Sequence, residues 1–496
     1  MIDRREKYMS FTKLRDYVPL FIVVLAVFTL LCIPFRILSY GYLPGDDSYR
    51  HVAKAVSGKD WSQILVVRDG FAFDHNPGWH AILRRLHQWA QWEPETLLAF
   101  SVAALFLGFA LVPLGWLRFP EAWLAALLVG VNASTAFTSR LSLGRPYLIS
   151  MAVLVALLFL WQDGKSAGRL KFRWLISILI IAAAVWIHGA WYLFAVPVAA
   201  FFLAKKWRSG MAMLLCWLLG SFAGACLTGH PWVFLKHAVV IALTSVDKSA
   251  LTQQWVTEYW PATGDFGMVL AVAAVLAWRS SRWGWNSDMV LNPAFMLAGL
   301  SWLLGFTVGR FWWDWGIPAA LVWMAGQFHQ SMEKPFGERP RARVGFSCLV
   351  AAGLFLSTTS DIAGRWTESL STEFLIPANQ EMAQWLPGDG GILYSSNQNV
   401  FYQTFFKNPG ASWRYMLGFD ATFMPPEDLA IYREIQRQHG TPQSYVPWVK
   451  KMRPPDRLVI RTTTGREPPI PELEWFYAIK DTWIGRLRSK PGQGKP

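Results

Sequence analysis

Residues Val18 to Leu38 read VPLFIVVLAVFTLLCIPFRIL, an apolar run interrupted by a single charged side chain, that of Arg36. A helix needs about 20 consecutive apolar residues to cross the hydrocarbon core of a bilayer. Three further apolar blocks of about this length lie at residues 96–117, 211–227 and 289–308. Such blocks are too long for a soluble core, so the sequence predicts a polytopic α-helical membrane protein.

The basic residues predict how the chain crosses the membrane. The 496 residues carry a formal net charge of +14, and most Lys and Arg lie in short clusters between apolar blocks, at residues 4–15, 118, 165–173, 205–208, 279–282 and 334–343. Two spans fit between neighbouring clusters, which gives about 11 spans if every cluster faces the cytoplasm. We therefore expect a protein of the bacterial inner membrane, with a cytoplasmic N-terminus and a periplasmic C-terminal region. Because the positive charge is dispersed between spans, we expect no binding to nucleic acid.

The tryptophans and cysteines fit the same class of protein. Amphipathic rings accumulate at membrane interfaces, and the chain has 29 Trp residues. All four cysteines lie in apolar segments and none forms a CxxC pair. We therefore expect neither a disulfide framework nor a zinc site.

The chain divides into two predicted domains. Residues 1–359 form a membrane module whose longest outward loops are 41–95 and 229–266, and residues 360–496 form a small α/β domain outside the membrane. In this tail, helix-like stretches at 377–386 and 427–438 alternate with strand-like stretches at 391–395 and 457–462. Chemistry is expected in the outward segments, which include the turns at 139–145, at His188 and at Arg310.

The first outward loop opens with a polar cluster. Residues 45–51 read Gly-Asp-Asp-Ser-Tyr-Arg-His and follow the first span directly. Two adjacent carboxylates at a membrane surface are costly unless they have a function. Asp47 or Ser48 is suited to cap a helix that ends near Gly58. Capping leaves Asp46 unexplained, so Asp46 is a candidate for chemistry.

A second polar cluster lies in the same loop. Residues 73–80 read Phe-Asp-His-Asn-Pro-Gly-Trp-His. The Pro-Gly pair predicts a turn that leads into an amphipathic helix from Trp79 to Trp89. The loop therefore carries carboxylates and imidazoles in both of its halves.

These clusters resemble the first outward loop of the GT-C superfamily of membrane glycosyltransferases. Gly45-Asp46, Arg50-His51 and the later Asp74-His75-Asn76-Pro77 are similar to the Gly-Asp…Arg-His and Asp-x-Pro-Pro pattern of the dolichyl-phosphate-glucose glucosyltransferases. The strong resemblance covers the first loop. The predicted topology, with its outward C-terminal domain, extends it more weakly over the whole chain.

The resemblance implies a glycosyltransferase whose sugar donor is carried on a polyprenyl phosphate in the membrane lipid, and whose glycan, lipid or protein acceptor arrives from the outer side. It implies that Asp46 is the general base of an inverting transfer, with Asp47 capping the helix or orienting the acceptor. A base is needed because a hydroxyl acceptor is a poor nucleophile near neutral pH. Four further side chains of the loop would bind substrate around this base, namely Arg50, Asp74, His75 and His80.

Further candidates lie in the other outward segments. A leaving phosphate is stabilised by cations, so Arg145 and Arg310 are candidate contacts for the donor. His188 and Glu258 are candidates for other substrate contacts. Simpler roles also explain these residues: each Arg can be an anchor at a span end, His188 an interfacial histidine, and Glu258 part of an interfacial helix.

We expect no cofactor. A divalent cation would find oxygen ligands at Asp46 and Asp47, but the sequence shows too few further ligands for a metal site. The loop between the third and fourth predicted spans has no acidic residue that would complete one. We therefore expect metal-independent transfer.

Three other functions are compatible with the sequence. The nearest is an oligosaccharyltransferase or glycan ligase with a polyprenyl-diphosphate donor. Residues 312–316, Trp-Trp-Asp-Trp-Gly, are similar to the Trp-Trp-Asp-Tyr-Gly motif of asparagine-linked oligosaccharyltransferases, although that motif lies in a soluble domain and this one between two spans. A lipid or glycan transporter would place ionisable residues near mid-bilayer, whereas charges here gather at span ends. In a non-catalytic scaffold, the Asp pair would only cap a helix.

Overall fold

The computed structural model describes residues 3–69, 74–162, 170–246, 260–262, 265–377, 380–462 and 465–488. The chain forms two compact units. The first contains the residues up to Tyr42 and most of residues 100–367, and the second contains Leu43–Ala99 and the residues from Glu368 onward. The first loop therefore belongs to the same unit as the C-terminal region.

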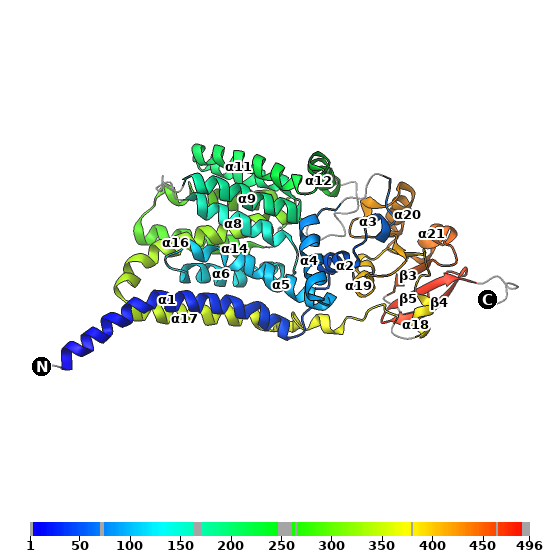
Figure 1. Ribbon diagram of the computed structural model, residues 1–496, viewed down its shortest axis with the longest axis horizontal. Helices are drawn as coiled ribbons and strands as arrows, with labels where there is room; N and C mark the ends of the chain where they lie inside the picture. The colour runs from blue at the N-terminus through cyan, green and yellow to red at the C-terminus, as the bar shows by residue number, and fades with distance from the viewer. Residues whose placement is uncertain are drawn as a thin grey trace. The chain divides into compact units, whose positions relative to one another are not determined.

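The first unit is helical (Figure 1). Its helices, including most of α5, are α1 (Asp3–Ser39), α5 (Pro94–Ala110), α6 (Glu121–Ala133), α7 (Thr135–Leu141), α8 (Tyr147–Gln162), α9 (Leu170–His188), α10 (Ala195–Leu203), α11 (Trp207–Cys226), α12 (Pro231–Val246), α14 (Phe266–Trp283), α15 (Pro293–Gly305), α16 (Ile317–Glu338) and α17 (Pro340–Thr359). Short helical turns are η1 (Val112–Gly115), η3 (Trp191–Phe194), η5 (Ser287–Met289), η6 (Phe311–Gly316) and η7 (Ile362–Gly364). A bend of 115° separates α6 from α7 because Ser134 ends one helix and caps the next.

Several of these helices are suited to a bilayer. Among the described residues, four helices are long and apolar enough to cross it: Tyr17–Ser39, Pro94–Gly115, Trp207–Cys226 and Pro340–Thr359. The bent pair of α6 and α7 would make a fifth span, and shorter apolar helices occur at Tyr147–Trp161, Phe172–His188, Trp191–Leu203, Pro231–Leu243 and Pro293–Gly305. By length and composition, these helices identify the chain as a membrane protein. The count of about 11 spans and their orientation stay predictions.

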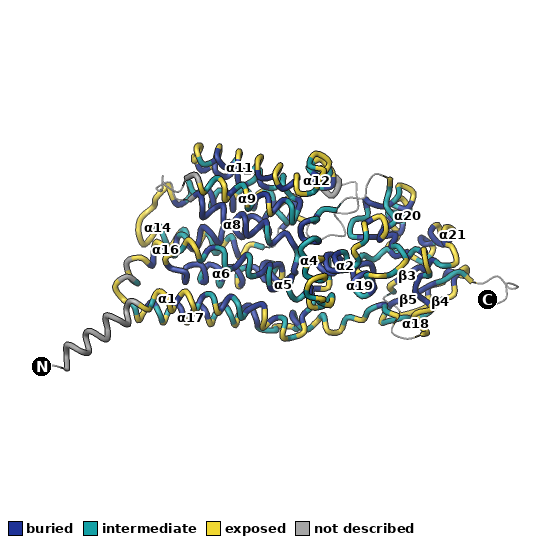
Figure 2. The backbone as a smooth tube through the Cα atoms, viewed as in Figure 1, coloured by how far each residue is buried: buried dark blue, intermediate teal, exposed yellow. Residues whose placement is uncertain are grey.

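Helices α9 and α11 pack closely because small residues line their contact. A Cβ atom on Gly220 of α11 would lie 2.9 Å from the carbonyl oxygen of Ile178, and one on Gly224 would lie 2.4 Å from that of Ala182. Only glycine fits such a backbone approach, as at many helix contacts in membranes. Helix α8 is buried along most of its length (Figure 2).

Over its described residues, the second unit combines helices with a five-stranded sheet in the order β2-β1-β3-β5-β4. The strands are β1 (Ile392–Ser395), β2 (Arg414–Tyr415), β3 (Arg457–Arg461), β4 (Leu473–Ile479) and β5 (Thr482–Leu487). β1 pairs in parallel with β2 and β3, whereas β5 pairs antiparallel with β3 and β4. The helices and turns are α2 (Asp47–Ser57), α3 (Trp61–Ile64), α4 (Pro77–Ala90), η8 (Glu368–Ser371), α18 (Gln380–Trp385), α19 (Gln398–Lys407), η9 (Ala421–Phe423), α20 (Pro426–Arg437), η10 (Pro442–Tyr445) and α21 (Val446–Lys451).

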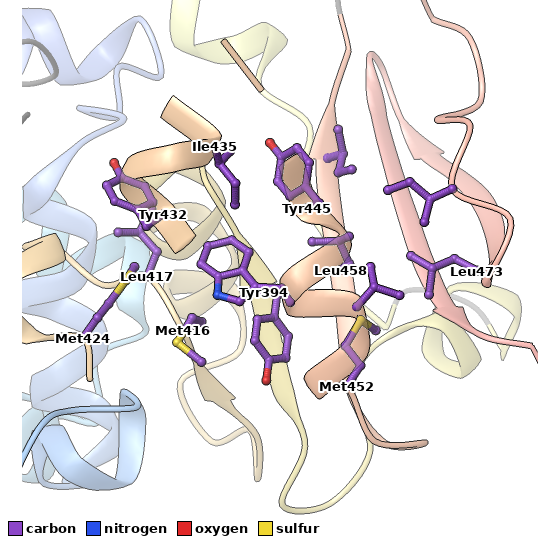
Figure 3. Close-up of a cluster of buried hydrophobic side chains, with 14 residues drawn as sticks. Tyr394, Met416, Leu417, Met424, Tyr432, Ile435, Tyr445, Met452, Leu458 and Leu473 are labelled. Atoms are coloured by element: carbon purple, nitrogen blue, oxygen red, sulfur yellow. The ribbon is translucent and has the colours of Figure 1, made fainter. Parts of the chain in front are cut away.

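An apolar core holds the sheet to its helices (Figure 3). Tyr394 of β1 and Leu458 of β3 pack in one cluster with Ile435 of α20 and Trp448 of α21. The first four residues of β3 are all buried, as expected of a central strand that is covered on both faces. This core fixes the sheet on which the first loop packs.

The first loop is attached to the C-terminal elements within the second unit. Leu65 pairs with Tyr415 of β2, and the backbone N–H of Val66 donates to the Tyr415 carbonyl at 2.9 Å. The ring of Tyr49, which is fully buried, stacks on that of Phe406 with a centroid distance of 4.4 Å. Backbone pairing and ring stacking therefore position the loop that carries both polar clusters.

The four elements expected in the tail are present. α18, β1, α20 and β3 lie at or within the predicted stretches, and α2 ends where expected, with Gly58 in the left-handed region at φ 64°. The sequence pattern did not indicate α19 or the β4–β5 hairpin, because the hairpin mixes aromatic and charged residues without clear alternation. The expected domain division after residue 359 stays a prediction.

Single-cysteine labelling tests the predicted topology. In a background without the four native cysteines, Gly410→Cys should react with an impermeant maleimide in cells whose outer membrane surface is accessible, and Lys206→Cys should react only after lysis. Gly410 is a suitable site because an added Cβ meets nothing within 4 Å, whereas at Gly391 it would lie 2.4 Å from the Pro455 carbonyl oxygen. Protection of Gly410→Cys in intact cells would contradict an outward C-terminal region.

Candidate functional site

The acidic pair of the first loop stands at the start of α2. Asp46 is the N-cap, and its Oδ1 accepts hydrogen bonds from the backbone N–H of Ser48 at 3.1 Å and from the Ser48 hydroxyl at 3.3 Å. The expectation that Asp47 or Ser48 caps the helix is wrong. Asp46 accepts the hydrogen bond from the backbone N–H of Ser48 instead, because its own backbone, at φ −135° and ψ −146°, lies outside the helical region. The first helical residue is therefore Asp47.

Asp47 faces two side chains on the next turn of α2. Its carboxylate accepts hydrogen bonds from Arg50, one from Nε and one from Nη2 at 3.0 Å to Oδ2. The same Oδ2 lies 3.3 Å from Nε2 of His51. Residues three and four positions apart share one face of a helix, so these contacts follow from local spacing. Arg50 is buried, with its guanidinium 3.9 Å from the ring centre of Phe419.

The second cluster stands at the start of α4. Oδ1 of Asp74 accepts a hydrogen bond from the backbone N–H of Asn76 at 3.0 Å. Oδ2 of Asp74 lies 2.8 Å from Nδ1 of His80, whose side chain is buried. The carboxylate therefore both orders the turn before α4 and orients the imidazole on its first turn.

One histidine pair joins the two clusters. Helices α2 and α4 pack together, and Nδ1 of His51 lies 2.9 Å from Nε2 of His80. Asp47, His51, His80 and Asp74 thus form a continuous series of polar contacts, which we name the carboxylate–histidine chain. Both imidazoles are almost fully buried, with 1% and 6% of the residue exposed.

Burial sets the charge of the carboxylate–histidine chain. Burial and the charge of Arg50 lower the pKa of His51 to about 3, and Asp47 only partly opposes this shift. Burial likewise lowers the pKa of His80, against the opposing attraction of Asp74. Burial would raise the pKa of Asp74, but interactions with His80 and Lys54 outweigh it and hold that pKa low. At neutral pH, both imidazoles are neutral and Asp74 is ionised.

The first unit holds a separate group of charged residues. Arg310 precedes η6, and its Nε lies 3.4 Å from Oδ2 of Asp314. Oδ1 of Asp314 accepts a hydrogen bond from Nε of Arg140 at 2.8 Å. Arg140 and Asp314 are both 5% exposed, and the Arg140 guanidinium lies 4.5 Å from the ring centre of Tyr147. Pairing of this kind makes a buried charge tolerable.

His188 belongs to the same surroundings. Its Nδ1 lies 2.8 Å from the hydroxyl of Ser150, and its ring centre lies 6.5 Å from that of Tyr147. The Tyr147 hydroxyl donates to the carbonyl oxygen of Arg140 at 2.7 Å. The structure therefore connects His188 with the Arg310 group through Tyr147.

The remaining candidates are placed as follows. Arg145 lies half-buried just before α8. The ring of His75 stacks on that of Phe423 at a centroid distance of 5.9 Å. Glu258 lies outside the described residues. Substrate contact by these three side chains stays a prediction.

Sequence reasoning missed three residues of these groups as site residues, namely His51, Arg140 and Asp314. Helical spacing could have indicated His51, because it lies four residues after Asp47. No local signal joins Arg140 to Asp314, which are far apart in the chain. In the part of the chain that the structure describes, no group of three or more His, Cys, Asp or Glu side chains is arranged to hold a metal ion. Asp46 and Asp47 are directed at Ser48 and Arg50, and we propose no cation there.

Comparisons with known proteins add little. No family model matches the chain, and no curated protein matches its sequence. Among solved structures, the oligosaccharyltransferase of Archaeoglobus fulgidus, described as a complex with Zn and sulfate, is similar at 12% identity and a TM-score of 0.49. The match covers 90% of this chain and 68% of that one. Similarity at this level does not establish a common fold, so the function must be argued from the residues of the chain.

The buried histidines predict a pH-dependent stability. Between the low pKa of His51 in the folded chain and about 6.5 in the unfolded chain, the unfolded state binds more protons, so the free energy of unfolding rises with pH. Stability of the purified protein should fall from pH 7.5 to 5.5, with a limiting slope of about 1.4 kcal/mol per pH unit for each buried histidine. Denaturant unfolding at both pH values measures this, and His51→Gln should weaken the dependence. Equal or greater stability at pH 5.5 would contradict the neutral, buried state.

Proposed function

We propose that the chain is a membrane glycosyltransferase, which transfers a sugar from a polyprenyl-phosphate-linked donor to an acceptor outside the cytoplasm with inversion at the sugar carbon. One observation carries the proposal: both polar clusters of the first loop meet in one buried, hydrogen-bonded group. The resemblance of these clusters to the GT-C loop supports the same function. A helix cap alone would not need the second cluster.

The general base is proposed within the acidic pair. The transfer breaks the O–H bond of the acceptor as the new glycosidic bond forms, so a carboxylate must take the proton. The sequence favoured Asp46 because Asp47 was expected to cap α2. Since Asp46 is the cap and Asp47 contacts His51, we assign the base to Asp47. Asp46 then orders the first turn of α2 and holds its neighbour in place.

The leaving phosphate needs a cation rather than an acid. Arg310 is proposed to supply it, with Arg145 as a second candidate. The side chain of Arg310 is 29% exposed, and its guanidinium is held by Asp314, which Arg140 holds in turn. A planar guanidinium can bind two phosphate oxygens at once, so its orientation by Asp314 favours recognition of a phosphate over simple anchoring.

Asparagine substitutions test the base. Asp47→Asn should lower the transfer rate by about 10² to 10⁴, because an amide cannot accept the proton. Asp46→Asn should be milder, since Asn caps a helix about as well as Asp. Asp60→Asn, at the N-cap of α3 in the same loop, is the matched control and should transfer at the wild-type rate. The measurement is transfer by purified variants, with the donor and acceptor that accumulate in a deletion strain.

Two other results are informative. If Asp46→Asn is inactive while Asp47→Asn is active, the base is Asp46, as the sequence suggested. If both variants transfer at the wild-type rate, the glycosyltransferase proposal is wrong, and a transporter or scaffold explains the chain better.

Arginine substitutions test the phosphate contact. Arg310→Ala should weaken donor binding, and Arg310→Lys should restore it only in part, because Lys keeps the charge and loses the planar fork. Arg282→Ala, which removes an exposed basic residue at the end of α14, serves as the control. Binding of a polyprenyl-phosphate sugar to purified protein is the measurement. Wild-type affinity of Arg310→Ala would leave Arg310 only an anchoring role.

A further inference from the structure

We propose that His51 and His80 carry the proton, which Asp47 removes from the acceptor, onward to Asp74. This inference rests on the proposed function, in which Asp47 is the base of a glycosyl transfer. It adds a role for two buried histidines that neither helix packing nor capping requires. It also explains why the loop pairs its carboxylates with imidazoles in both halves.

The geometry provides an unbroken path. Oδ2 of Asp47 lies 3.3 Å from Nε2 of His51, Nδ1 of His51 lies 2.9 Å from Nε2 of His80, and Nδ1 of His80 lies 2.8 Å from Oδ2 of Asp74. Each imidazole uses both ring nitrogens, one toward each neighbour. A ring that accepts a proton on one nitrogen can release the proton on its other nitrogen.

Counting the protons on the two imidazoles shows which of the three contacts lacks a proton. The path has three contacts, and each contact needs one proton to form a hydrogen bond. Two neutral imidazoles supply two protons. The shortest contact joins Nδ1 of His80 to an ionised Asp74, so His80 must carry its proton on Nδ1 there.

The position of that proton fixes the rest of the path. Nε2 of His80 must accept, so His51 also carries its proton on Nδ1. Nε2 of His51 then presents a lone pair to Asp47, and this contact is the longest of the three. The vacant proton position therefore lies between Asp47 and His51, next to the proposed base.

The transfer balances without any other reactant. Asp47 takes the proton of the acceptor hydroxyl and passes it to Nε2 of His51. His51 releases its Nδ1 proton to Nε2 of His80, and His80 releases its Nδ1 proton to Asp74. Asp47 is again a carboxylate, Asp74 is a carboxylic acid, and both rings remain neutral with the proton moved from Nδ1 to Nε2. After the product leaves, the reverse sequence returns the proton to Asp47 and then to water.

The surrounding charges keep the proton from being trapped on a ring. Asp47 and Asp74 face the two imidazoles from the ends of the path, and the cations Arg50 and Lys54 of α2 disfavour an imidazolium. The low pKa of His51, about 3, means that an imidazolium formed at this ring would release its proton readily. Arg50 also disfavours the protonated form of Asp47, because it binds the carboxylate in its ionised form.

Interrupting the path tests its role in transfer. His80→Asn keeps a donor toward Asp74 and removes the nitrogen that faces His51. It should lower the maximal transfer rate by about 10², leave the Michaelis constants unchanged, and make the rate rise with pH, because the proton must now leave Asp47 by another route. His87→Asn is the matched control on the same helix, since Nδ1 of His87 lies 2.8 Å from the Trp92 carbonyl oxygen, away from the carboxylate–histidine chain. A histidine with a purely structural role would change the rate without changing the pH profile.

A second measurement decides the path independently of transfer. In Asp74→Asn, the amide oxygen must keep the hydrogen bond from the backbone of Asn76, so the amide nitrogen faces Nδ1 of His80 as a donor. His80 must then carry its proton on Nε2, and His51, which Asp74 does not touch, must shift its proton to Nε2 as well. Solid-state ¹⁵N NMR of histidine-labelled protein in membranes distinguishes protonated from unprotonated ring nitrogens, with His51→Gln and His80→Asn used for assignment.

The two measurements separate the possible failures. A joint change of tautomer in Asp74→Asn, with a changed pH profile in His80→Asn, supports the path. An unchanged tautomer at His51 overturns it, and so does a wild-type rate and pH profile in an active His80→Asn. If the wild type transfers no sugar, the proposed function fails. The NMR result alone then decides whether the proton positions of His51 and His80 are coupled along the carboxylate–histidine chain.

Discussion

The contact between Nδ1 of His51 and Nε2 of His80, at 2.9 Å, is the interaction on which the candidate site depends. A buried polar group must find a partner, because an unsatisfied one costs about 1–3 kcal/mol. Each imidazole pairs both of its ring nitrogens only when α2 and α4 lie side by side. The two helices therefore cannot separate without leaving one nitrogen of each buried imidazole without its partner, and the register between them brings the two polar clusters together.

Buried polar groups in the helical unit also need partners, and there they find them in ion pairs. Asp314 holds Arg140 at 2.8 Å and Arg310 at 3.4 Å, so one carboxylate orients two guanidinium groups. Breaking a buried ion pair is typically destabilising by about 3–5 kcal/mol, because one charge is left without its partner. In both units, charged residues are arranged by other charged residues rather than by apolar packing alone.

Contacts with C-terminal residues hold the first loop, and with it the candidate site, in place. The loop forms helices of its own, but Tyr49 stacks on Phe406 and Leu65 pairs with Tyr415, so C-terminal residues determine its position. Arg50, which holds Asp47, rests on the ring of Phe419. The small sheet therefore acts as a support for the loop, and a defect in its apolar core is transmitted to the carboxylate–histidine chain through these contacts.

The sequence by itself determined the features that depend on neighbouring residues. Apolar runs of span length indicated a membrane protein, and the i, i+4 spacing of Asp47 and His51 already placed them on one helical face. The strands β1 and β3 and the helices α18 and α20 were also predictable, because each has a local apolar pattern. Only the tertiary structure decided which carboxylate caps α2 and which side chains meet across helices. A cap depends on the backbone angles of one residue, and the contacts of His51 with His80 and of Arg140 with Asp314 join residues 29 and 174 positions apart, for which local spacing contains no information.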